Sequence, residues 1–270
     1  MSGDLDAVRL KLRRAQEHAD TLHSAIDAFL WRDAYDATVE LDAQTNELLV
    51  SMIVRERPPP EWGPLLGDFV HNLRSALDHL AIALVLSNKP TAKINQTAFP
   101  MFAKDPLRSN APASDKAAWK KRISGMTAQQ VAAINAVQPF NNPLQAGRTD
   151  TLTVLNSLSN TDKHKRLIPI GGFAGETVTL IPRKLDGWQL HATTGTVPVG
   201  PIQHGAVIAR FPLTPIETNP DVDVKVVAQV GIGITLDEGV PPGTAIDQVL
   251  RASYTRVLDI VNDFEAKFFA

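Results

Sequence analysis

The chain has 270 residues, 44% hydrophobic and 21% charged, and these proportions suit an ordinary globular protein with a substantial core. A formal net charge of -2 gives no general attraction to nucleic acid, and the absence of cysteine excludes disulfides, thiolate zinc sites and a cysteine nucleophile. The N-terminal segment is charged throughout, and the longest apolar run, residues 80–86, is far shorter than a membrane span. We therefore expect a cytoplasmic chain with no membrane partner.

The first elements in chain order are two long helices with a hairpin between them. Apolar residues at helical spacing predict an amphipathic helix over residues 4–31. Alternating apolar residues around a polar turn predict a β-hairpin over residues 35–57, which ends at a triple proline because proline cannot donate to a strand ladder. A second long helix is predicted over residues 65–87.

Shorter helices follow, after a proline-rich irregular segment. They are predicted over residues 115–123, 127–137 and 149–158. The second of them carries its own start signal, because Thr127 followed three residues later by Gln130 matches a capping box.

From residue 167 the apolar pattern changes to period two, with glycine and proline between the segments, and an amphipathic helix closes the chain. Helices followed by strands predict an α+β fold, with a helical half that contains the early hairpin, then a mainly antiparallel sheet and a C-terminal helix. A helical region 1–166 and a β region 167–270 are expected, or one integrated domain in which the hairpin joins the later sheet. The predicted strands are 167–170, 177–182, 188–193, 206–211 and 222–236.

Polar side chains gather on the second long helix, in the stretch HNLRSALDHLAIAL (residues 71–84). On a helical wheel they flank an apolar stripe where the helix enters the interior, a position that perturbs pKa values and makes hydrogen bonding obligatory. The cluster is therefore either an active site or a structural network in which Arg74 pairs with Asp78. Its members are His71, Arg74 and Asp78 on one side, and Asn72 and His79 on the other.

The segment RSALDH resembles the Arg-x4-6-His signature of HEPN domains, with Ser75 where asparagine is usual. That resemblance implies a metal-independent ribonuclease without cofactors, in which His79 transfers a proton and Arg74 stabilises the phosphate charge. It also implies RNA as substrate and a homodimer whose paired helices form a composite cleft. The same spacing occurs at Arg13 and His18 in the first helix, where we expect only a solvated face.

A second polar cluster lies in NTDKHKR, at the expected junction between the last short helix and the first strand. We expect a loop-like basic patch suited to phosphate. The alternative is that its cations complement the dipole of a helix C-terminus. The cluster comprises Asn160, Asp162, Lys163, His164, Lys165 and Arg166.

The motifs LRSALDHLA, VQPFNNP and NTDKHKR together resemble an uncharacterised bacterial protein family over residues 60–170. This resemblance implies that Arg74, His79, Asp162 and His164 converge on one site. Their His and Asp side chains could also hold a metal, although no recognised ligand spacing is present, and we expect none. Two functions stay open: a HEPN-like endoribonuclease, and a ligand- or protein-binding module whose polar cluster is structural.

Overall fold

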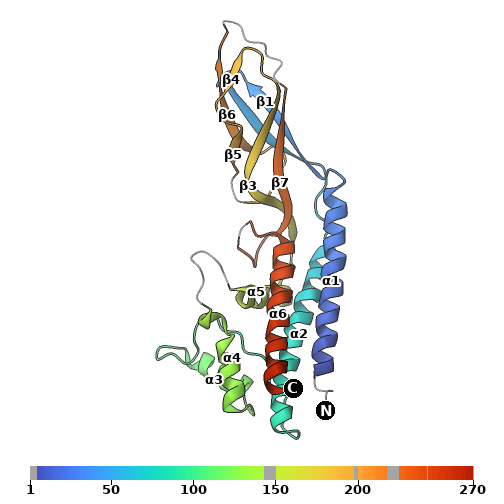
Figure 1. Cartoon of the computed structure of the whole chain (residues 1–270), viewed down its shortest axis with the longest axis vertical. Coiled ribbons are helices and arrows are strands. Elements are labelled where there is room, and N and C mark those ends of the chain that lie inside the picture. Colours follow the sequence, from blue (N-terminus) through green and yellow to red (C-terminus); the bar gives the residue numbers. More distant parts are fainter. Residues whose placement is uncertain (1–4, 143–149, 198–199, 218–224, 242, 270) are drawn as a thin grey trace. The chain divides into compact units, whose positions relative to one another are not determined.

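A computed structural model describes residues 5–142, 150–197, 200–217, 225–241 and 243–269, and it is α+β, as predicted (Figure 1). The chain divides into two compact units. The helical unit comprises residues 1–22, 63–167 and 247–270, and the β unit comprises residues 23–62 and 168–246.

The helical unit is built on three long helices, α1 (Asp6–Leu30, which continues into the β unit), α2 (Trp62–Asn88) and α6 (Ile246–Phe268). Each presents a buried apolar stripe, and α2 is almost wholly apolar after His79, as the sequence predicts. An Arg9–Glu265 ion pair joins α1 to α6.

Three short helices complete the helical unit: α3 (Ala113–Arg122), α4 (Ala128–Ala136) and α5 (Thr151–His164), with a 3-10 turn, η2 (Pro139–Asn141). The capping box predicted for α4 is present, because Thr127 and Gln130 exchange hydrogen bonds. The Gln130 side chain is buried and donates to Leu84 O at 2.9 Å, so α4 is fixed to the end of α2.

The β unit holds two antiparallel sheets that share one apolar core. The predicted hairpin is present and joins the later strands, because its second strand pairs with β6. One sheet has the order β1-β2-β6-β4 and the other β5-β3-β7. The strands are β1 (Tyr35–Asp42), β2 (Glu47–Val54), β3 (Pro169–Lys184), β4 (Trp188–Leu190), β5 (Thr194–Thr196), β6 (Val207–Pro215) and β7 (Lys225–Leu236).

Several strands differ from the prediction: β4 ends at Leu190 rather than at residue 193, and β6 continues to Pro215 rather than ending at residue 211. The segments expected as separate strands at 167–170 and 177–182 form the single strand β3, whose register against β7 shifts between Phe173 and Val178. The glycine-rich segment between them is therefore a bulge-like irregularity rather than a break. β5 was not predicted as a separate strand because it has only three residues. Residues 222–224 of the last predicted strand lie outside the described residues.

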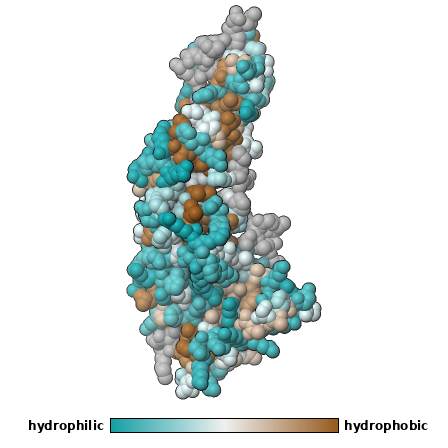
Figure 2. All heavy atoms as spheres, turned by 180° about the vertical axis from the view of Figure 1, so that it is seen from behind, coloured by the Kyte–Doolittle hydropathy of each residue, from teal (hydrophilic) through white to brown (hydrophobic). Residues whose placement is uncertain are grey.

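Exposed large apolar side chains are few and belong to different elements. Figure 2 shows small apolar groups within a largely hydrophilic face. No described helix has the length and apolar character needed to cross a membrane. The exposed set consists of Leu10, Trp31, Leu107, Ile168, Val207, Ile216 and Val227.

Candidate functional site

The Arg74–Asp78 pair on α2 holds the backbone of a neighbouring segment. Arg74 Nη2 donates to Phe99 O at 2.7 Å and lies 3.1 Å from Asp78 Oδ1. Asp78 Oδ1 in turn accepts a hydrogen bond from the Phe99 N–H at 2.9 Å. The Arg74 side chain is only 14% exposed. Burial lowers the pKa of its guanidinium, Asp78 raises it and Arg122 lowers it again. These contacts match the structural interpretation of the pair.

The structure does not bring Arg74 and His79 together. Five residues along an α-helix correspond to a rotation of about 140°, so the two side chains leave α2 in different directions. His79 is half-buried, and among the described residues its ring has no hydrogen-bond or ion-pair partner. Asn72 is buried, donates to Asp68 O at 2.8 Å and accepts from Lys11 Nζ at 3.3 Å, so it links α2 to α1.

The second cluster is helical as far as His164, so the expectation of a loop was wrong for that part, whereas Lys165 and Arg166 follow the end of the helix. α5 continues to His164, six residues beyond the predicted end, and the Lys165 N–H still bonds to Thr161 O at 2.6 Å. Lys163 and His164 occupy the last turn, where cations interact favourably with the helix dipole. The side chains from Asn160 to Arg166 are exposed, apart from the half-buried Thr161.

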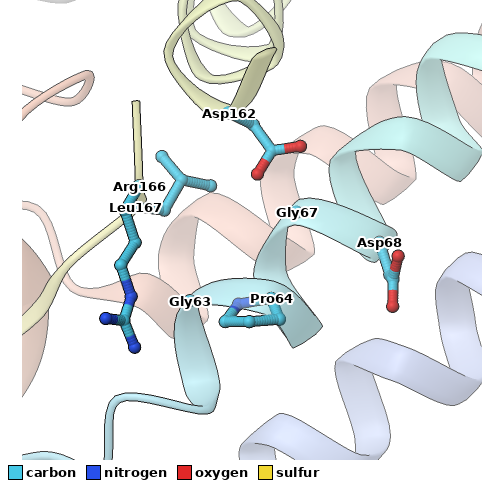
Figure 3. Close-up of a pocket in the computed structure, with 7 residues that line it drawn as sticks. All are labelled: Gly63, Pro64, Gly67, Asp68, Asp162, Arg166 and Leu167. Carbon is cyan, nitrogen blue, oxygen red and sulfur yellow. The ribbon is translucent and has the colours of Figure 1, made fainter. Parts of the chain in front are cut away.

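Asp162 and Arg166 are the members of this cluster that lie against the start of α2. A pocket of about 290 Å³ opens between the start of α2 and the end of α5 (Figure 3). Of the four residues expected to converge, Asp162 lines this pocket, whereas Arg74, His79 and His164 are not among its lining residues. The lining residues are Gly63, Pro64, Gly67 and Asp68 from α2, and Asp162, Arg166 and Leu167 from the end of α5 and beyond.

Two glycines permit the close approach of these segments. A Cβ at Gly67 would lie 2.9 Å from Asp162 Cγ and 3.0 Å from Oδ2, so the Asp162 carboxylate occupies space that a side chain would otherwise fill. A Cβ at Gly63 would overlap the backbone carbonyl oxygen of Leu167. In Figure 3 the Asp162 carboxylate points toward Gly67, whereas the Arg166 guanidinium extends past Gly63.

The pocket carries opposite charges. Desolvation raises the pKa of Asp162, the neighbouring Asp68 raises it further, and His71 lowers it. Neither the Asp68 nor the Asp162 carboxylate has a hydrogen bond or an ion pair within the described residues. The pKa of Asp162 is higher in the folded chain than in the unfolded chain, so ionisation of this carboxyl lowers the free energy of unfolding. The loss reaches its full size once the pH exceeds the pKa in the folded chain.

Sequence reasoning found Asp162 and Arg166 but missed the α2 side of the pocket. A signal was present in WGPLLGD, because Gly63 and Gly67 are spaced four residues apart and therefore lie on one face of the helix. Glycine inside a helix is about 1 kcal/mol less favourable than alanine, so two on one face indicate close approach by another segment.

In the part of the chain that the structure describes, no three His, Asp or Glu side chains are grouped closely enough to hold a metal ion. Compared with protein-family models, curated proteins and solved structures, the chain matches none. The functional interpretation therefore depends on the geometry of the pocket and of the α2 cluster.

Proposed function

We propose that this chain is a binding module that holds a small polar ligand in the pocket between α2 and α5. The observation that carries the proposal is the pair of carboxylates, Asp68 and Asp162, which line a pocket without an ion-pair partner among the described residues. Carboxylates that repel each other while one is partly desolvated are unfavourable for folding, and such arrangements are typical of binding sites.

The internal contacts of Arg74 support a binding function over catalysis at α2. Its guanidinium donates to a backbone carbonyl and pairs with Asp78, and both contacts would have to break before it could bind a phosphate through the same atoms. The pocket, in contrast, offers charged groups around an accessible space of a size suited to a small ligand.

Thermal unfolding with inorganic phosphate, guanidinium, ethylammonium and glycine at constant ionic strength tests this proposal. We expect at least one probe to raise the Tm of the wild type, because a ligand that binds only the folded state stabilises it. Gly67→Ala is the matched variant: its methyl group displaces the Asp162 carboxylate, while alanine favours the helix. Equal shifts in both proteins, or no shift with any probe, would contradict the proposal.

Metal-independent RNA cleavage by His79 and Arg74 is a second candidate. The observation that favours it is the run of exposed cations from Lys163 to Arg166, a surface suited to phosphates. This candidate also needs a homodimer, because the two catalytic side chains diverge on one helix. A bacterial origin and a cytoplasmic location are part of the same proposal.

Incubation with RNA in EDTA tests the second candidate. Wild type should cleave the RNA, and His79→Ala should lose at least about a hundredfold in rate while retaining its helical circular dichroism, since a general acid–base residue contributes that much. His18→Ala is the control, because His18 follows Arg13 with the same spacing. Intact RNA after incubation with the wild type, or equal loss in both variants, would count against ribonuclease activity.

A further inference from the structure

The segment from Lys89 to Arg122 is strongly basic, although the whole chain is slightly acidic. It carries eight lysines and arginines against two aspartates, a net charge of +6, whereas the rest of the chain carries 19 such cations against 27 acidic residues, a net charge of -8. No acidic residue occurs between Asp115 and Asp150. The eight cations, which we call the α3 basic surface, are Lys89, Lys93, Lys104, Arg108, Lys116, Lys120, Lys121 and Arg122.

The α3 basic surface lacks carboxylate partners. None of its eight cations forms an ion pair within the described residues. The lysines and arginines that pair with a carboxylate all lie elsewhere, so the uncompensated charge is a property of this segment and not of every exposed cation in the chain. Those paired cations are Arg9, Arg14, Arg55, Arg74, Lys184, Arg210 and Lys267.

Contacts within the helical unit hold the loop before α3 against that helix, so the cations of both share one surface. Phe102 packs edge-on against Trp119, with 6.0 Å between the ring centroids, and the Arg122 guanidinium lies 5.5 Å from the centroid of the Phe102 ring. Lys116 Nζ donates to Ser109 O at 3.4 Å, a second link between the loop and α3. In Figure 1, α3 and α4 lie to one side of the long helices of this unit.

Like charges also meet at the end of α3. Asn88 Nδ2 donates to Gly125 O at 3.0 Å, so the start of the segment, Lys89, lies near the last turn of α3, which holds three cations. The helix dipole favours those three but does not account for the five cations outside that turn. Burial lowers the pKa of the Arg74 guanidinium, and the nearby Arg122 lowers it further. Such repulsion opposes folding, and a bound anion would relieve it.

The side chains of this surface suit a row of phosphates better than a membrane. Helices that lie on membranes carry large apolar side chains opposite their lysines, but Trp119, the one large apolar residue of α3, is only 1% exposed. Leu107 is the only exposed large apolar side chain in this fully described segment. Six of the eight cations are lysines, which act as flexible point charges.

The aromatic side chains of the segment favour binding through the backbone of a nucleic acid and not through its bases. Phe99 and Trp119 are buried, and Phe102 packs against Trp119 and Arg122, so no ring of this fully described segment is free to stack on bases. Each strand of a nucleic-acid duplex offers one negative charge for about every 3.4 Å of helix axis, a density that an array of unpaired cations can neutralise.

We propose that the α3 basic surface binds the phosphate backbone of nucleic acid without regard to base sequence. The inference depends neither on the ligand of the pocket between α2 and α5 nor on RNA cleavage by His79. It assigns the nucleic acid to α3 rather than to the cations from Lys163 to Arg166.

Fluorescence anisotropy with labelled RNA and DNA duplexes, each in two unrelated sequences, tests the binding mode. We expect both sequences of each to bind wild type with affinities within about threefold, because phosphate contacts carry no base information. A rise from about 50 to 200 mM salt should weaken binding roughly a hundredfold, as expected when about four phosphates release their counter-ions. Binding of only one sequence, or an affinity that salt leaves unchanged, would overturn the proposal.

A triple variant assigns the surface. Replacing three exposed cations should weaken binding roughly tenfold to a hundredfold and reduce the slope of log affinity against log salt by about 3. These substitutions are Lys104→Gln, Lys120→Gln and Lys121→Gln. The matched control removes the same net charge at exposed positions that lack ion pairs within the described residues, and it should bind as wild type does. Its substitutions are Arg13→Gln, Arg183→Gln and Arg251→Gln. Equal losses in the two variants, or a folded α3 variant that binds as tightly as wild type, would contradict the proposal.

Further probes separate the alternative partners and sites. Equally tight binding of vesicles that contain phosphatidylserine, or of polyglutamate, would overturn nucleic acid as the partner. Loss of binding in Lys163→Gln combined with Lys165→Gln, while the α3 variant still binds, would move the site to the end of α5 and overturn the assignment. RNA that binds at α3 and stays intact would support this proposal while counting against ribonuclease activity.

Discussion

Gly63→Ala is expected to destabilise the helical unit by roughly 3 kcal/mol, a large effect for one added methyl group. The methyl group would overlap Leu167 O, a backbone atom that cannot rotate away. Leu167 is 2% exposed and Gly63 is buried, so neither segment can move without disturbing the core. Urea unfolding followed by far-UV circular dichroism measures the change.

Gly67→Ala is the control for that substitution. At Gly67 the obstacle is the end of the flexible Asp162 side chain, which can rotate away, so helix propensity should dominate and stability should stay level or rise by up to about 1 kcal/mol. Alanine should therefore lower the free energy of unfolding at Gly63 and leave it unchanged or raise it at Gly67, four residues further along the same helix. A Gly63→Ala protein as stable as wild type would show that α2 and Leu167 are not in close contact.

Arg74→Met is expected to destabilise the helical unit by about 2 to 3 kcal/mol, less than a fully buried pair would because the Asp78 side chain is 34% exposed. Methionine retains much of the apolar stem, but Phe99 O loses its donor and Asp78 loses its counter-ion. A double-mutant cycle that combines Asp78→Asn with Arg74→Met should give an interaction free energy of about 1 kcal/mol or more between the two side chains.

Arg13→Met is the control for the arginine. Arg13 has the same spacing to a following histidine, but it is exposed on α1, so its replacement should change stability by no more than about 0.5 kcal/mol. Equal, small effects of the two substitutions would show that Arg74 is not structural, and the ribonuclease candidate would gain.

The sequence predicted the regular elements because their patterns are local. The stripe on α1, the hairpin and the capping box at Thr127 each depend on neighbours within a few residues. The end of α5 was missed because the polar residues from Asn160 to His164 form no apolar period, although their backbone continues the helix. The glycines in β3 were interpreted as a break, yet pairing with β7 continues on both sides of them.

The candidate site was predicted in part. Asp162 and Arg166 were identified because charged residues in a short motif are visible in the sequence. Whether Asp162 meets Gly67 or Arg74 depends on how α5 packs on α2, a contact between residues about 95 positions apart in the chain. For the same reason the hydrogen bond from Arg74 to Phe99 could not be predicted.

Urea unfolding of Arg74→Met beside Asp162→Asn, at neutral pH, tests the central claim most directly: the α2 cluster is structural and Asp162 belongs to a binding site. Arg74→Met should lose about 2 to 3 kcal/mol. Asp162→Asn should be at least as stable as wild type, because the ionised carboxylate is desolvated and repelled by Asp68 above its raised pKa. The reverse result, a stable Arg74→Met and a strongly destabilised Asp162→Asn, would contradict the claim.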